Sequence, residues 1–247
     1  MTAPARTYPV KSDLAYTVVR NRVLTGEYAP GSSFNQATLA VELGISTTPL
    51  REALRKLESE GLVQLGAHRD AIVTDLSVEE ARDLLEMRLA LDPMAAGLAA
   101  QRRTRDDIAA IRAASDIHAL PGHPTIDQLV RHRRFHQTVY RASHNDVLVT
   151  TLDTLWDKND RYRLAGLRRD RDTDELARKD AEHHELMMRV IAGDSAGASA
   201  VMRRHIQSSL GAVATELLRE DDADGLRPRA PDAPEPYDSP DQEKRPV

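Results

Sequence analysis

Apolar residues recur at helical spacing through almost every segment between residues 77 and 218. Ser77 and Glu80 have the spacing of a capping box, so we predict that a long helix begins there. The apolar stripe of this helix contains Ala81, Leu84, Leu85, Leu91 and Ala95. Upstream, the elements are shorter and are interrupted by Gly and Pro. We therefore predict a mainly α fold, with a small N-terminal domain at 1–76 and an antiparallel helical bundle at 77–220.

The segment 221–247 differs in composition from the rest of the chain. It holds eight acidic and four basic residues and six of the thirteen prolines, with few large apolar side chains. Such a segment buries too little surface to offset the entropy lost on ordering, so we predict a disordered acidic, Pro-rich tail. The whole chain has 34 Lys and Arg against 39 Asp and Glu, for a net charge of −5. The tail carries most of this excess, and a nearly neutral folded part is compatible with a nucleic-acid partner.

Several classes of protein are excluded by what the sequence lacks. The chain has no cysteine, which excludes a disulfide scaffold, a thiol catalyst and a thiolate metal site. No apolar run approaches the ~18 residues of a membrane span. Residues 1–20 lack the apolar stretch of a signal peptide. We expect a soluble cytoplasmic protein with no membrane partner.

The N-terminal region has the signals of three short helices followed by a hairpin. The third helix is predicted to begin with Thr48 as its N-cap and Pro49 as its first helical residue, and to end before Gly61. Two β-prone runs, 62–65 and 71–74, follow on either side of a polar segment. Three helices closed by a small hairpin form a winged helix-turn-helix.

The third predicted helix has one apolar and one polar face. At 100° per residue its leucines and alanine gather on one side, and short hydroxyls and guanidinium groups lie on the other. Taken alone, Arg55 or Lys56 is typical of a solvated helix face. The unit as a whole favours binding in the major groove of double-stranded DNA. The candidate DNA contacts on this helix are Thr47, Thr48, Arg51 and Arg55.

Several short motifs occur together in this region: Pro30-Gly31, Leu39-Ala40, Gly44-Ile45-Ser46, Thr48-Pro49-Leu50-Arg51-Glu52-Ala53-Leu54 and Leu57-Glu58-x-Glu60-Gly61-Leu62. Over about 65 residues they resemble the DNA-binding domain of GntR-type bacterial transcription regulators. The resemblance implies a dimer on a palindromic operator.

The chain departs from this family's usual pattern at two positions. Such proteins usually carry Arg where this chain has Thr47, so a bidentate reader of guanine is lost there. They also carry Gly at the wing tip where this chain has Asp70, and the negative charge is expected to weaken wing contact with DNA. His68 and Arg69 are the predicted wing contacts.

Four of the nine histidines lie on the apolar stripes of predicted helices at 126–143, 173–192 and 196–218: His132, His136, His183 and His205. A single histidine on an apolar face is usually a hydrogen-bonded core residue. Four of them would each need a separate buried partner. A shared divalent metal ion would satisfy all four, with the i, i+4 pair supplying two ligands from one helix face.

Arg88 falls in the middle of the apolar stripe of the helix that begins at Ser77. A guanidinium group cannot become neutral by losing a proton, so it needs an anionic partner in an apolar seam. The sequence leaves two partners open, an acidic residue of the core or the carboxylate of a bound ligand.

A second set of motifs extends over the helical region: Glu86-x-Arg88-x-x-Leu91, Phe135-His136, Ala142-Ser143-x-Asn145, Glu182-His183, Gly193-Asp194 and His205. These motifs resemble the all-helical effector domain of FadR-type GntR regulators, the FCD domain, over roughly 77–218. A count of six helices is similar to the VanR-type subgroup.

The resemblance also implies a ligand site. Metal-binding members of this family hold their ion with three histidines and an acidic residue, and the acidic position is occupied here by His132. The resulting all-nitrogen site suits Zn²⁺ or Ni²⁺. The resemblance places Arg88 in an effector cavity with Asn145 nearby, and the effector would be a small carboxylate.

We therefore expect a metabolite-responsive transcription regulator, a repressor that binds its operator as a homodimer. The first alternative is a metal-dependent hydrolase that uses the four histidines. The segment 132–136 reads HRRFH rather than HExxH, so it lacks the glutamate base of that class. The second alternative is a regulator whose metal ion is purely structural.

Overall fold

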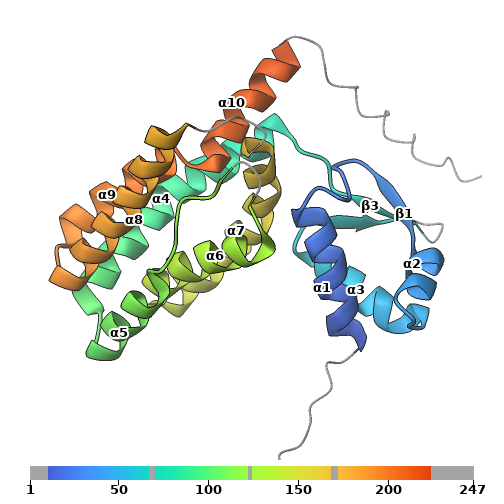
Figure 1. The fold of residues 1–247 in the computed structure, drawn as a ribbon, viewed down its shortest axis with the longest axis horizontal. Helices are drawn as coiled ribbons and strands as arrows, with labels where there is room; N and C mark the ends of the chain where they lie inside the picture. Colours follow the sequence, from blue (N-terminus) through green and yellow to red (C-terminus); the bar gives the residue numbers. More distant parts are fainter. Residues whose placement is uncertain (1–10, 67–69, 122–123, 168–171, 224–247) are drawn as a thin grey trace, which may run out of the picture.

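The computed structural model describes residues 11–66, 70–121, 124–167 and 172–223. Its fold consists of a small N-terminal unit with three helices and a sheet, and a larger bundle of helices (Figure 1). The chain passes from the first unit to the second just before Ser77. The mainly α fold predicted from the sequence is confirmed.

The N-terminal unit is a winged helix-turn-helix. Its sheet has the order β1-β3-β2, and β3 is antiparallel to both neighbours. The predicted hairpin is therefore the larger part of a three-stranded sheet. The elements are α1 Lys11–Leu24, β1 Ser33–Asn35, α2 Gln36–Glu42, α3 Thr47–Ser59, β2 Val63–Leu65 and β3 Asp70–Val73.

The apolar face of α3 holds this unit together. Leu50, Leu54 and Leu57 are completely buried in a core shared with α1 and the sheet. After α3 the chain reverses at Gly61, whose φ of +72° is a conformation that glycine adopts without strain. The Leu62 N–H donates to the Leu57 carbonyl at 2.9 Å, which ends the helix and starts β2.

The C-terminal unit is a bundle of long helices. Ser77 accepts a hydrogen bond from the Glu80 N–H at 3.2 Å, so the predicted helix start is confirmed. In Figure 1 the helix α4 runs beside α8 and α9, with α6 and α7 on the side nearer the winged helix. The helices are α4 Val78–Arg102, α5 Arg105–Ala114, α6 Ile126–Arg141, α7 Asp146–Gly166, α8 Thr173–Ala192, α9 Ser195–Gln207 and α10 Leu210–Ala223.

The prediction of one helix over 196–218 is wrong. The helix stops at Gln207, and α10 starts afresh because the Ser209 hydroxyl accepts from the Ala212 N–H at 3.3 Å. The described part of the bundle therefore has seven helices, where the sequence suggested six. The start of α10 lies so close to α7 that a Cβ at Gly166 would be 2.2 Å from the Leu210 carbonyl oxygen.

The C-terminal end of α10 lies inside the predicted tail. The helix continues to Ala223, so the tail cannot begin at residue 221. Residues 224–247, on which the rest of that prediction falls, lie outside the described part. None of the helices described here is long and apolar enough to cross a membrane.

Polar contacts join the two units. Arg20 on α1 donates to the Asp160 carboxylate on α7 at 3.0 Å. Arg161, also on α7, donates to the backbone oxygen of Asp75 at 2.8 Å and to Glu80 at 2.9 Å. The helix α7 therefore contacts the N-terminal unit directly while also forming part of the bundle.

Candidate functional site

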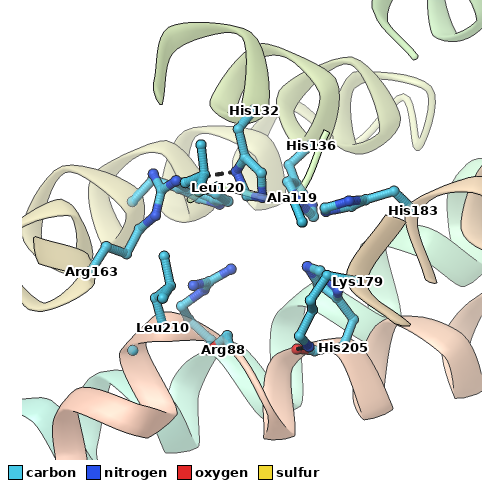
Figure 2. A pocket seen from close by; sticks show the side chains of 13 residues that line it. Arg88, Ala119, Leu120, His132, His136, Arg163, Lys179, His183, His205 and Leu210 are labelled. Atoms are coloured by element: carbon cyan, nitrogen blue, oxygen red, sulfur yellow. Dashed lines mark hydrogen bonds between the residues drawn. The ribbon is translucent and has the colours of Figure 1, made fainter. Parts of the chain in front are cut away.

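The four predicted histidines meet inside the bundle. His132 and His136 come from α6, His183 from α8 and His205 from α9. One ring nitrogen from each lies within 4.8 Å of the corresponding nitrogen of the others. Figure 2 shows these rings facing a common centre, with arginine and lysine side chains around it. Helical periodicity predicts that all four side chains face the core, as the structure has them.

The donors of this cluster suit a divalent metal ion. Neither ring nitrogen of His136 has a hydrogen-bond partner among the residues that the structure describes, although the side chain is fully buried. Burial lowers the pKa of His132, His136 and His205 well below the usual histidine range, and neighbouring positive groups lower it further. A neutral imidazole has a lone pair that can bind a metal ion, so a cluster of them fits Zn²⁺ or Ni²⁺.

His205 has the surroundings of a metal ligand. Its Nδ1 lies 2.9 Å from the Glu182 carboxylate, which can only accept a hydrogen bond. Nδ1 therefore carries the proton, and the lone pair is on Nε2. Lys179 holds the same carboxylate at 2.9 Å and also donates to the Ser208 hydroxyl. A carboxylate behind a histidine is the usual support of a ligating imidazole.

Arg163, on α7, contacts the cluster from the opposite side. It donates to Nδ1 of His132 at 3.2 Å and to the Asp160 carboxylate at 2.7 Å. Its guanidinium carbon lies 4.9 Å from the centre of the Trp156 ring. Arg163 is buried among these three partners.

Three arginine side chains donate hydrogen bonds to the Asp160 carboxylate. Arg20 of α1 and Arg133 of α6 each donate to one carboxylate oxygen at 3.0 Å, and Arg163 donates to the other. Burial opposes ionisation of Asp160, but the three positive charges hold its pKa below the usual range. A continuous polar chain thus runs from His132 through Arg163 and Asp160 to Arg20.

The structure gives Arg88 a partner within the protein. It donates to Asp92 at 2.7 Å, and Tyr140 donates to the same carboxylate oxygen at 2.7 Å. This is the first of the two alternatives that the sequence left open. Arg88 also lines the cavity beside the histidines, and its guanidinium carbon lies 4.7 Å from the centre of the Trp156 ring.

The cavity at the centre of the cluster is small and lined by positive groups. Its volume is about 40 Å³, room for roughly three water-sized groups. Arg88, Arg163 and Lys179 line it together with the four histidines. This lining favours a small anion.

The predicted DNA-contacting residues of α3 are free of the core. Thr47, Thr48, Arg51 and Arg55 are all exposed, whereas the leucines of the same helix are buried. The N-cap of α3 is Ser46 rather than Thr48, so both threonines lie in the first turn. In that position their hydroxyls and N–H groups are available to phosphates.

Two family models match the chain. The model described as "Bacterial regulatory proteins, gntR family" matches residues 11–70, and the FCD domain model matches residues 83–208, about half of the chain. The chain belongs to the GntR family. The resemblance inferred from the sequence motifs is confirmed for both domains.

Relatives of this GntR protein are regulators of transcription. It is 28% identical over 198 residues to the HTH-type transcriptional repressor GlaR of Escherichia coli, covering 77% of this chain and 90% of that protein. It is 30% identical to a regulator in an unstable DNA locus of Streptomyces ambofaciens, covering 78% and 80%. The solved structure of E. coli McbR/YncC has the same fold, with a TM-score of 0.70 at 21% identity, covering 85% and 100%.

Membership of the GntR family decides between two classes of function. Proteins of this family regulate transcription by binding DNA and are not enzymes. The hydrolase alternative is therefore set aside, and the chain is a DNA-binding transcription regulator.

The structure places one predicted effector contact of this GntR regulator, Asn145, away from the cavity. The Asn145 side chain is the N-cap of α7, where it accepts a hydrogen bond from the Leu148 N–H at 3.2 Å. It does not line the cavity. Trp156, which does, is on the same helix about 16 Å farther along at 1.5 Å per residue. Asn145 therefore serves to start α7.

The wing of the GntR domain is described only in part. His68 and Arg69, the predicted wing contacts, lie outside the described residues. Asp70 is exposed at the start of β3, where its carboxylate accepts a hydrogen bond from the Asn35 side chain at 2.9 Å.

Sequence reasoning missed the groups that support the histidines. Glu182, Lys179, Arg163 and Asp160 are all buried or nearly so, yet none was predicted as part of the site. Charged residues are common on bundle helices, and only the packing of α7 and α8 against α6 and α9 reveals which ones face inward. Glu182 alone carried a signal, since it precedes His183 in one of the motifs.

Proposed function

We propose that this chain is a metabolite-responsive repressor whose DNA binding is controlled from the four-histidine cavity. In this proposal the protein acts in the cytoplasm, and its winged helix binds a palindromic operator as half of a homodimer. A small organic acid enters the cavity and changes the affinity of the dimer for the operator.

The observation that carries this proposal is the meeting of four histidines with three cationic side chains around one small cavity. A site made only to fill the core would not gather so many polar groups, because burying each of them costs free energy. Imidazole nitrogens suit a divalent ion, Zn²⁺ first and Ni²⁺ second. Such an ion supplies a positive centre for a carboxylate oxygen, and Arg88 supplies hydrogen-bond donors beside it.

The proposed route to the DNA-binding unit is the chain of contacts between the cavity and α1. One nitrogen of the Arg163 guanidinium donates to His132 at the cavity, and another donates to Asp160. The Asp160 carboxylate also accepts a hydrogen bond from Arg20. An anion that attracts Arg163 would weaken the ion pair between Arg163 and Asp160. The ion pair between Asp160 and Arg20 would then change in strength. Coupling of this kind requires the anion to favour one arrangement over the other.

A thermal-shift screen tests the effector site. We expect one class of small carboxylic acid to raise the melting temperature of metal-loaded wild-type protein, by an amount equivalent to about 2.7 kcal/mol at 100 times its Kd. The same acids should not shift Arg88→Gln, which keeps much of the side-chain volume but loses the charge. If metal loading raises the melting temperature while no acid adds to it, the metal ion is purely structural and the effector proposal fails.

Substitution of Arg20 tests the route to the DNA-binding unit. Arg20 is the residue of α1 in this series of polar contacts. The Arg20→Ala substitution removes it and leaves the Asp160–Arg163 ion pair in place. We expect unchanged metal affinity and at least a threefold smaller effect of the bound acid on operator affinity, measured by fluorescence anisotropy.

The matched control for this prediction is Arg22→Ala, on the same helix. Arg22 pairs with Glu42 and Glu27, both inside the DNA-binding unit. This variant should keep the wild-type response to the acid. Equal responses in Arg20→Ala and wild type would show that the signal takes another path.

A further inference from the structure

His132 differs from the other members of the cluster in the partner of its Nδ1. That partner is the Arg163 guanidinium, 3.2 Å away and drawn as a dashed line in Figure 2. A guanidinium group can only donate hydrogen bonds, so Nδ1 of His132 must accept. A neutral imidazole has one N–H and one lone pair. The lone pair of His132 is used by Arg163, and its proton is therefore on Nε2.

His205 has the opposite arrangement. Its Nδ1 faces the Glu182 carboxylate, which can only accept, so Nδ1 carries the proton and Nε2 has the lone pair. A metal ion needs that lone pair, and ligating histidines commonly donate their other N–H to a carboxylate in this way. The two residues thus present different atoms to the same cavity: a lone pair from His205 and an N–H from His132.

The tautomer of His132 is set by a buried neighbour. Arg163 is 4% exposed, pairs with Asp160 at 2.7 Å and lies over the Trp156 ring. Turning the His132 ring over would exchange Nδ1 for a C–H group and leave Arg163 without this acceptor. A buried cation that loses a hydrogen-bond acceptor is costly, so the observed ring orientation is favoured.

We propose that His136, His183 and His205 hold the metal ion, and that His132 donates its Nε2–H to an oxygen of the anion bound beside it. This inference rests on the proposed function, because it assigns roles within the same metal and carboxylate site. Three protein ligands leave coordination positions open, as in sites where an ion also binds a small molecule. His132 then selects for ligands that offer an acceptor oxygen toward α6.

The test compares two asparagine variants. In His132→Asn the shorter amide can still accept from Arg163 through Oδ1, but no atom replaces Nε2. In His183→Asn one proposed ligand is lost. We expect His132→Asn to change Zn²⁺ affinity less than threefold in competition with a chromophoric chelator, and His183→Asn to lower it at least 100-fold. The visible spectrum of the Co²⁺-loaded protein should likewise survive only the first substitution.

Anion binding supplies the second readout. With acetate as the probe, the metal-loaded His132→Asn protein should bind at least fivefold more weakly than wild type. His132→Gln, whose amide reaches the position of Nε2, should recover part of that loss. Unchanged acetate binding in His132→Asn would overturn the role of His132 as a donor.

The outcomes separate this inference from the proposed function. If wild type binds Zn²⁺ and His132→Asn loses it as fully as His183→Asn does, His132 is a fourth ligand and the inference fails alone. If wild type binds neither Zn²⁺ nor Co²⁺, the metal site itself is wrong and both fail. Thermal unfolding of the metal-free variants identifies any loss that comes from a defect in folding.

Discussion

Arg51→Ala is expected to reduce operator affinity by roughly 30-fold to 10⁴-fold while leaving the metal content of the protein intact. A bidentate arginine contact to a base is worth ~1–3 kcal/mol, and a dimer on a palindrome makes it twice. Arg51 is exposed and forms no ion pair with any residue that the structure describes, so its removal should change stability by no more than about 0.5 kcal/mol. The affinity can be measured on duplexes selected from a random library with the wild-type protein.

The matched control for this substitution is Arg82→Ala, an exposed arginine of α4 whose partners are the neighbouring acids Asp83 and Glu86. This variant should bind the selected duplexes as wild type does. If Arg51→Ala binds them normally, α3 is not the reading helix. Loss of DNA binding and metal together would point to misfolding.

His183→Asn is expected to remove the metal ion from the bundle. The residue is buried among the other histidines, and its ring centroid lies 4.6 Å from that of His205 and 5.3 Å from that of His136. Substitution of groups behind a metal ligand typically lowers metal affinity 10-fold to 100-fold, so loss of a ligand should exceed that range. Equilibrium dialysis against Zn²⁺ buffered by a chelator measures the change.

The control is His118→Ala, since His118 is an exposed histidine outside the cluster. It should retain about one ion per chain with wild-type affinity. Equal binding by His183→Asn and His118→Ala would mean that the ion, if present, sits elsewhere. The DNA-binding unit is separate from α8, so both variants should still bind selected duplexes in the absence of any acid.

Helical periodicity was enough to predict which histidines meet. His132 and His136 share a helix face because they are four residues apart, and the apolar stripes of α8 and α9 contain His183 and His205. Each stripe must face the core, so three helices that pack together bring these residues to one place. The winged helix-turn-helix could be predicted equally well, because helix caps, turn glycines and apolar spacing depend only on residues close together in the sequence.

The partners of these histidines were beyond sequence reasoning. Arg163 and His132 are 31 residues apart on different helices, and their contact depends on how α6 and α7 cross. The sequence gives the face of a helix but not its neighbour. Arg88 shows the same limit: the need for an anion was clear, while its pairing with Asp92 one turn later depended on the rotamers that the core allows.

Two differences between expectation and structure have local causes. Ser209 looked like one more residue of a helix over 196–218, but serine competes for backbone N–H groups and starts a new helix here. Asn145 followed the pattern of a family motif, and its side chain is spent on capping α7. A short polar side chain can thus belong to a helix or a site, or it can cap a helix, and periodicity does not distinguish these roles.

Operator affinity under controlled metal and acid conditions tests the central claim most directly. The wild-type protein and His183→Asn would each be titrated onto a selected duplex, metal-free and Zn²⁺-loaded, with a panel of two- to four-carbon carboxylic acids. We predict that at least one condition shifts the wild-type Kd by about tenfold, within the usual range of coupling energies, and that His183→Asn shifts less than twofold. A wild-type Kd that is the same in every condition, or an equal shift in His183→Asn, would contradict control of DNA binding from the histidine cavity.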